Sequence, residues 1–209
     1  MTKFLALSSC VTLLLSGALS AQETSRFAYS GGAGFTAPVG NTGRNLDYGW
    51  NVGAGFGVNI IPWIGVMVDL NYNSMGVNST QLTNLGYGGG NLNVFSATLD
   101  PIIHVTPRKK FDLYFTGGGG IYHRTQDFTQ PTVLVGRAFN PFFGFFPVAF
   151  PADRIVASYT VNRPGIDAGM GIAFGSKWHG KFFAEARYNR IFIGNRHTDY
   201  IPVTFGFRR

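Results

Sequence analysis

Cysteine and charge are both scarce in this sequence. Cys10 is the only cysteine among 209 residues, which excludes a disulfide framework and a cysteine-ligated metal site. Charged residues make up 13% of the chain and aromatic residues 15%, whereas a disordered chain needs high charge and few aromatics. The 29 glycines also argue against a protein of long helices. The composition is that of a β-rich protein with an apolar, lightly charged surface.

The first residues have the pattern of an export signal. A largely apolar run, Phe4–Leu19, follows one lysine, and Ala18–Ala21 ends in the small-x-small pattern that signal peptidase cuts. We expect residues 1–21 to be a cleaved signal peptide and residues 22–209 to form one mature domain without cysteine. The run is short for an uncleaved anchor, and Leu7–Cys10 resembles a lipoprotein box only formally. After the signal, no run of 18 apolar residues predicts a membrane-spanning helix.

Strict alternation of apolar with small or polar residues dominates the rest of the chain. From Tyr48 to Ile60 every second residue is apolar, and the residues between them are Gly or Asn. A period of two is typical of a β-strand with two unlike faces. The same pattern predicts eight strands, in segments 27–37, 47–60, 64–73, 92–105, 111–124, 155–175, 182–189 and 201–208. The phase of the alternation slips near Val94, which we interpret as a β-bulge.

The connections between these segments alternate in length. Short connections lie near Pro62 and at 106–110 and 176–180. The long connections are 38–46, 76–91, 126–154 and 191–199. Short periplasmic turns, long external loops and an even strand number are typical of outer-membrane barrels, in which closure pairs every backbone group. We therefore predict an all-β fold, a closed eight-stranded antiparallel up-and-down transmembrane β-barrel.

The glycine-rich face indicates which side of the barrel points outward. A soluble periplasmic lipocalin-like barrel, which stays an alternative, would turn its apolar face inward. A glycine-covered exterior would be poorly packed, whereas Trp50 and Phe56 suit a surface in contact with lipid. We expect the apolar face to point outward, with aromatic residues near the strand ends at the membrane interfaces. These are Trp63, Tyr122, Trp178, Tyr200 and Phe207.

The chain resembles the small outer-membrane β-barrels of the OmpA/OmpX type. The resemblance is carried by the signal peptide, the alternating hairpins, and the segments TGGGGIYHR, FFAEARYNR and DYIPVTFGFRR. The last segment is similar to the C-terminal strand that the barrel-assembly machinery recognises, although Arg208 and Arg209 follow Phe207 where the family ends on an aromatic residue. The resemblance implies an integral outer-membrane protein, inserted by that machinery and surrounded by outer-membrane lipid and lipopolysaccharide. We also expect the protein to be a monomer.

Charged residues on the inward face predict a network in the barrel interior. They are Asp69, Asp100, Asp112, Asp167, Glu185 and Arg187. Arg124 and Arg190 are further candidate partners for the carboxylates. Buried charges are costly unless they are paired, so we expect salt bridges to fill the interior. Because eight strands leave room only for side chains, a closed plug is favoured over a narrow gated pore, which remains an alternative.

The long connection 126–154 is rich in phenylalanine and proline. Exposed apolar patches usually mark interaction sites. The candidate binding patch consists of Phe139, Phe142, Phe143, Phe145, Phe146 and Phe150. Two interpretations stay open. The segment is either a binding surface for a hydrophobic ligand or an extracellular partner, or it extends the neighbouring strands and rests on the outer leaflet or the barrel rim.

Catalysis and cofactors have weak support in the sequence. Some small outer-membrane barrels that modify lipid A use a Ser–His pair, but here His123 and His197 would each need a threonine nucleophile. The histidines show no clustering suited to a metal, and no glycine-rich phosphate loop stands between a strand and a helix. The net charge of +7 sits largely in short turns, so nucleic acid is not expected. We predict a structural or surface-binding role without a cofactor, with a lipid A-modifying enzyme as an alternative.

Overall fold

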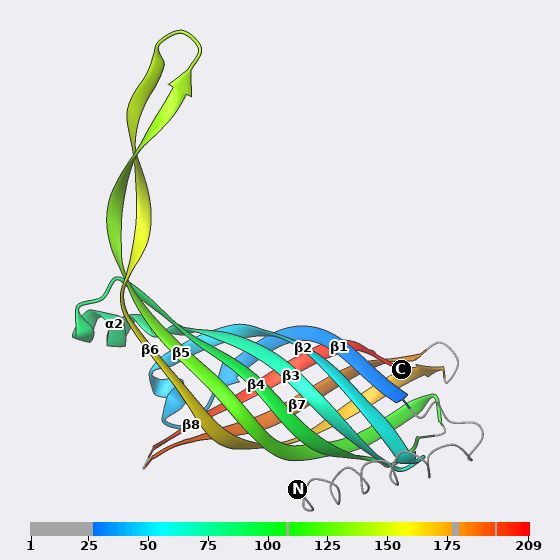
Figure 1. The fold of residues 1–209 in the computed structure, drawn as a ribbon. Helices are drawn as coiled ribbons and strands as arrows, with labels where there is room; N and C mark the ends of the chain where they lie inside the picture. Colours follow the sequence, from blue (N-terminus) through cyan, green and yellow to red (C-terminus); the bar gives the residue numbers. More distant parts are fainter. Residues whose placement is uncertain (1–26, 108, 177–179, 195) are drawn as a thin grey trace, which may run out of the picture.

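The computed structural model describes residues 27–107, 109–176, 180–194 and 196–209, and within them eight strands and two short helical segments (Figure 1). The expected signal peptide, residues 1–21, and Trp178 lie outside the described residues. The strands are β1 (Phe27–Pro38), β2 (Leu46–Ile61), β3 (Ile64–Val77), β4 (Gly89–His104), β5 (Phe111–Asn140), β6 (Gly144–Ser176), β7 (Gly180–Ile193) and β8 (Arg196–Arg208). The helical segments are η2 (Thr42–Arg44) and α2 (Ser79–Leu85). Neither of these helices is long and apolar enough to cross a membrane.

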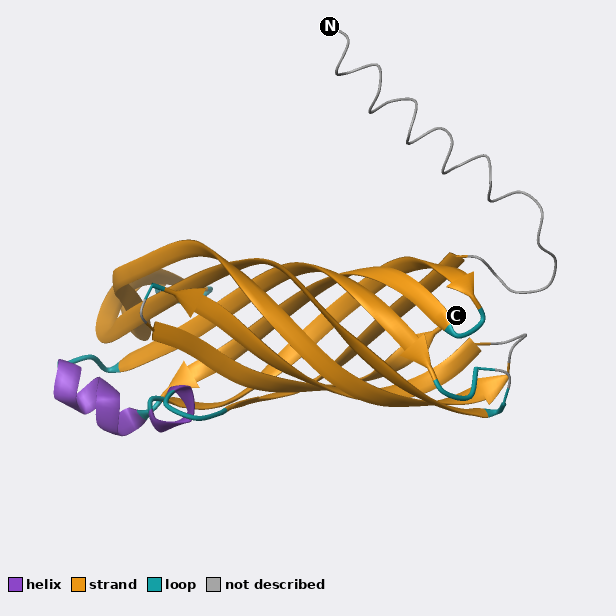
Figure 2. Ribbon diagram, turned by 90° about the horizontal axis from the view of Figure 1, so that it is seen from below, coloured by secondary structure: helices purple, strands orange, loops and turns teal. Residues whose placement is uncertain are grey.

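Every strand pairs antiparallel with its neighbours in the sequence, and β1 pairs with β8 to close the ring. The strands are tilted around the barrel, as Figure 2 shows. The β2–β3 and β4–β5 turns lie at the end that carries the C-terminus, which we call the turn end (Figure 1). The opposite end, the loop end, carries α2 and the extended β5–β6 hairpin (Figure 1). The predicted closed eight-stranded barrel is confirmed.

The apolar side chains of the alternating pattern point outward, as predicted. In β2, Trp50 and Phe56 are exposed, Phe56 to 65%, whereas Asn51 and Gly55 between them are buried. Glycine on the inner face makes room for larger side chains from neighbouring strands. A Cβ on Gly171 of β6, for example, would lie 2.3 Å from the ring of Tyr114, its cross-strand partner in β5.

The outer face of β5 and β6 carries a belt of apolar residues. It runs from the pair Phe111–Phe174 to the pair Ile121–Pro164. Eleven residues at ~3.3 Å each, tilted by ~45°, rise about 25 Å, which is the height of the apolar band of outer-membrane barrels. Beyond the belt, polar pairs begin with His123–Asn162. We take this pair as the loop-end boundary of the belt.

Two expectations were wrong, and both for the same physical reason. No bulge occurs near Val94, because the pairing of β4 with β3 and β5 runs without a register shift between Asn91 and Leu99. The phase slips because the inner face itself becomes apolar toward the loop end, where Val94 is fully buried. Tyr122 and Tyr200, expected at the membrane interface, are also fully buried in this inner face. Trp63 and Phe207 point outward at the turn end.

Segment 126–154, predicted as a loop, is a β-hairpin that continues β5 and β6. Its ladder reaches the pair Asn140–Gly144, with one register shift between Phe128 and Thr129. Figure 1 shows that the ribbon leaves the barrel at the loop end and runs sideways, across the long axis of the barrel. The segment therefore extends the neighbouring strands, and it projects away from the barrel.

Candidate functional site

The interior of the barrel is built in layers. Toward the loop end lies an apolar layer, closed above by Leu82 of α2. Its buried members are Leu46, Met75, Val77, Leu92, Val94, Tyr122, Ile191 and Tyr200. A second apolar layer lies toward the turn end and contains Met67, Ile102, Tyr114 and Ala173, with Phe183 packed against it. The polar and charged side chains lie between the two, as the inward order Met67, Asp69, Asn71, Asn73, Met75 along β3 shows.

Arg187 of β7 is the centre of the polar layer. Its Nη2 donates to Asp69 at 2.8 Å, its Nη1 donates to Asp100 at 2.6 Å, and its Nε donates to Glu185. Asp167 Oδ1 lies 3.7 Å from the same Nη1. The Arg187 side chain is 12% exposed and that of Asp100 is fully buried. One guanidinium from β7 thus contacts carboxylates of β3, β4, β6 and β7 and connects opposite walls of the barrel.

Five of the six predicted interior charges meet at this point, and the sixth does not. Asp112 lies at the turn end, where it accepts from His104 at 2.7 Å, from Lys181 at 3.5 Å and from the Thr106 N–H at 3.2 Å. Through these contacts Asp112 holds the β4–β5 turn against β7. Sequence reasoning could not assign Asp112 to this cluster, because Lys181 lies 69 residues away in the sequence.

The two further candidate arginines have other partners. Arg190 points outward and donates to Asp199 at 2.8 Å and to Tyr188 at 2.7 Å. Arg124 donates to Gln126 at 2.7 Å. Sequence reasoning also missed the neutral partners of the polar layer. The Tyr122 hydroxyl donates to Asn189 at 3.1 Å and lies 3.3 Å from Asp167, so an apolar-layer side chain reaches into the charged layer.

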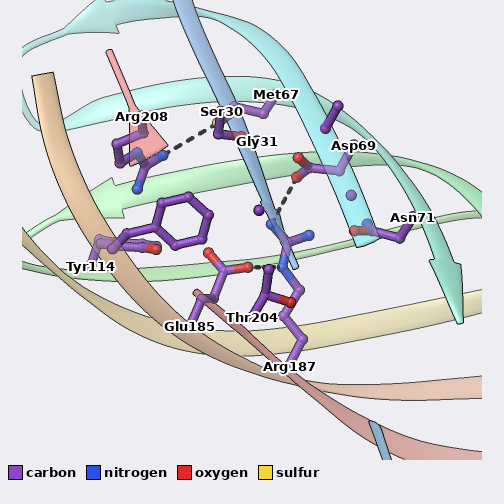
Figure 3. Close-up of a pocket in the computed structure, with 14 residues that line it drawn as sticks. Ser30, Gly31, Met67, Asp69, Asn71, Tyr114, Glu185, Arg187, Thr204 and Arg208 are labelled. Carbon is purple, nitrogen blue, oxygen red and sulfur yellow. Dashed lines mark hydrogen bonds and ion pairs between the residues drawn. The ribbon is translucent and has the colours of Figure 1, made fainter. Parts of the chain in front are cut away.

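The cavities described in the interior are small. One of about 30 Å³ lies beside Arg187, and Figure 3 shows Arg208 next to Tyr114 at its edge. The Arg208 guanidinium carbon lies 4.3 Å from the centre of the Tyr114 ring. A second cavity of about 20 Å³ is lined by Asn189 and Thr204 among others. Each has room for about one or two water molecules.

The end of the β5–β6 hairpin, residues 138–152, is the most exposed apolar part of the described chain; we call it the Phe tip. It has no charged residue. Phe142 is 89% and Phe143 84% exposed at the turn. The rings of Phe139 and Phe145 pair across the strands with centres 5.2 Å apart. All six phenylalanines of the predicted binding patch lie in the Phe tip, on a two-stranded ribbon that has no core of its own.

A hydroxyl–imidazole–amide arrangement lies on the outer face of β5 and β6, at the boundary of the apolar belt. His123 Nδ1 lies 2.6 Å from Asn162 Oδ1, and Thr125 Oγ1 lies 3.5 Å from His123 Nε2. Thr125 Oγ1 is also 3.2 Å from Thr160 Oγ1. Sequence reasoning considered His123 with a threonine nucleophile, which would be Thr125, but missed Asn162, which the register of the β5–β6 pair brings alongside.

The other candidate histidine has no such arrangement. His197 lies 3.6 Å from Asp199, but Thr198 between them is buried on the inner face. In the part of the chain that the structure describes, no group of three or more His, Cys, Asp or Glu residues is placed to hold a metal ion.

Comparison with known proteins agrees with this architecture. The chain is similar to the Neisserial surface protein A (TM-score 0.56, 12% identity, covering 90% of this chain and 98% of that one). It is also similar to Ail, the attachment invasion locus protein of Yersinia pestis (TM-score 0.51, 14% identity, covering 90% and 100%). At these identities the likeness shows the fold alone. No curated protein matches the chain. The family model "Outer membrane protein beta-barrel domain" matches residues 6–208, and the chain therefore belongs to the outer-membrane β-barrel family.

Proposed function

We propose that this protein is an integral outer-membrane barrel with a filled, non-conducting interior and a surface-binding role carried by the Phe tip. The observation that carries the proposal is the exposure of six phenylalanines on a hairpin that projects from the loop end. Monomeric proteins rarely expose a contiguous apolar patch without an interaction partner. The apolar belt contacts outer-membrane lipid and lipopolysaccharide, and the barrel-assembly machinery inserts the protein as a monomer.

The layered interior supports a closed barrel rather than a pore. Apolar layers lie on both sides of the ionic layer, and the cavities beside Arg187 hold about one or two waters each. A permeating ion would have to cross an apolar layer and displace side chains bonded to Arg187. The polar layer therefore suits a structural role in fixing the strands.

Photo-crosslinking in intact cells tests the binding role. A photoreactive phenylalanine analogue at Phe143 should form an adduct with a lipid or a protein. The matched control is Leu85 of α2, an exposed apolar residue at the same end of the barrel (55% exposed). Adducts at Phe143 in excess of those at Leu85 support the proposal. Equal, low yields at both positions contradict it.

A second candidate function, acyl-ester chemistry on membrane lipid, is favoured by the arrangement of Thr125, His123 and Asn162. A hydroxyl beside an imidazole whose other nitrogen is held by a third group is the general pattern of an activated nucleophile. The hydroxyl would attack a lipid acyl carbonyl, the imidazole would take its proton and return it to the leaving alcohol, and water would release the fatty acid. The site lies at the edge of the belt, where ester groups of the lipid are expected.

Lipid analysis tests this second candidate. Purified protein in phospholipid or lipid A vesicles should release fatty acid, and His123→Ala and Thr125→Ala should each abolish the release. His197→Ala is the matched control, because its neighbour Thr198 is buried. Lipid profiles that are the same for wild type and His123→Ala contradict acyl-ester chemistry and leave the binding role unaffected.

A further inference from the structure

We propose that the Phe tip inserts into the hydrocarbon of the leaflet in which the barrel itself stands and forms a second membrane anchor away from the barrel. This inference rests on the proposed function, since it names the partner of the same hairpin. The partner is the acyl-chain region of the protein's own membrane, rather than a protein or a second membrane.

Both faces of the Phe tip are apolar, which suits a surrounding medium rather than a one-sided groove. The register pairs Phe139 with Phe145 on one face, whereas Phe146 and Phe150 occupy the other. Phe142 lies at the turn itself, so the apolar surface continues around the end. A ribbon that binds a protein through one face keeps its other face polar. Hydrocarbon, in contrast, contacts all sides of an inserted segment.

The prolines of the hairpin adapt its two free edges to lipid. Pro131, Pro147 and Pro151 occupy alternate pairs of the ladder, opposite Asp153, Arg137 and Val133. In an antiparallel ladder, alternate pairs turn their N–H groups outward from a two-stranded ribbon. Proline at such a position has no N–H group, which lowers the cost of placing the edge in hydrocarbon. The same prolines disfavour the addition of a further strand from a protein partner.

The part of the Phe tip between Arg137 and the turn has a length that matches the depth of one leaflet. Arg137 is the first charged residue before the turn, five residues from Phe142. Five residues at ~3.3 Å span about 17 Å, close to half of the ~30 Å hydrocarbon core. With the turn buried in the leaflet, Arg137 and its ladder partner Pro147 would reach the level of the lipid phosphates, and Phe150, which pairs with Leu134, would lie above them.

The direction of the hairpin favours insertion into the protein's own membrane over insertion into an apposed membrane. The ribbon runs across the barrel axis, hence along the membrane surface rather than away from it (Figure 1). To insert, the hairpin tilts from this direction toward the leaflet that lies beside the barrel. The register shift between Phe128 and Thr129 lies just beyond the last polar pairs of the belt boundary, where a bulge bends a strand. From Thr129 to Phe142, thirteen residues at ~3.3 Å reach about 43 Å from the barrel. An apposed membrane would require the ribbon to stand along the barrel axis instead.

Depth-dependent fluorescence quenching tests the inference. In the full chain with Cys10→Ser, a single cysteine introduced as Phe143→Cys is labelled with an environment-sensitive dye. The protein is reconstituted in phosphatidylcholine vesicles that carry nitroxides on their acyl chains. Phe56→Cys, in the belt, is the buried-in-lipid control, and Leu85→Cys, on α2, is the water control. The dye at Phe143 should be quenched as strongly as at Phe56 and should resist aqueous iodide. Adding Phe145→Asp and Phe146→Asp should move it to the behaviour of Leu85.

Two results would overturn the inference. Iodide quenching at Phe143 equal to that at Leu85 would place the tip in water. In a parallel preparation whose own vesicles lack nitroxides, quenching that begins when separate nitroxide vesicles are added would assign the tip to a second membrane. If the photo-adducts at Phe143 persist in either case, the surface-binding role stands without the anchor. If no adduct forms at all, the binding role fails as well.

Discussion

Replacing Arg187 with methionine should destabilise the barrel strongly, because a single guanidinium compensates four interior carboxylates. Asp69, Asp100 and Glu185 accept hydrogen bonds from Arg187, and Asp167 lies within ion-pair distance. Methionine keeps much of the volume of the side chain but no charge. The four acidic side chains would then share the polar layer without a cation in contact.

The expected loss follows from the burial of these groups. Removing one partner of a buried ion pair costs roughly 3–5 kcal/mol. The side chains involved are at most 12% exposed, so solvent offers little screening. With a urea slope of about 1–3 kcal/mol per M, the unfolding midpoint should fall by on the order of 2 M. Arg187→Lys should lose less, since it keeps the charge but not the fork that reaches several carboxylates.

Urea titration in lipid vesicles, followed by tryptophan fluorescence and by heat-modifiable migration on gels, measures this loss. Arg154→Met is the matched control, because Arg154 is exposed on the β5–β6 hairpin outside the barrel, and its removal should change the midpoint little. Adding Asp100→Asn to Arg187→Met should recover part of the loss. A midpoint for Arg187→Met equal to that of the wild type would refute the assignment of Arg187 as the centre of the interior.

Three further predictions concern packing, conduction and the turn end. Gly171→Ala should destabilise the barrel by roughly 1–3 kcal/mol in the same titration, because its Cβ would overlap the Tyr114 ring; an unchanged midpoint contradicts this packing. Wild type and Glu185→Ala should both be silent in planar-bilayer recordings, because the apolar layers persist in both; regular conductance steps in either would refute the closed interior. Asp112→Asn should speed hydrogen exchange at Thr106 and its neighbours in the β4–β5 turn, since Asp112 holds that turn through three partners; unchanged exchange there argues against this role.

The strands and their outward face could be predicted because alternation is a local signal. Trp50 and Phe56 share a face through a period of two, whatever the rest of the chain does. The clustering of Asp69, Asp100, Asp167 and Glu185 around Arg187 depends instead on register. That register follows from chain closure and cannot be read from one strand.

The predictions that were wrong failed because alternation along one strand does not show what each face of the strand contacts. Val94 and Tyr122 face inward in an apolar layer, and an alternating pattern does not distinguish an apolar interior layer from a change of face. The hairpin beyond Thr129 also lacked clean alternation, because both of its faces are apolar. Asn162 lies 39 residues after His123 in the sequence and comes beside it only through the pairing of β5 with β6.

The most direct test of the account is a spin-label scan along β2 in lipid vesicles, from Trp50 to Val58. Labels at the even-numbered positions should be accessible to oxygen, which concentrates in lipid, and protected from a water-soluble nickel complex. A label at Leu85 on α2, which is exposed outside the barrel, is the water control and should show the opposite accessibilities. Nickel accessibility at the even-numbered positions equal to that at Leu85 would contradict a lipid-facing apolar surface.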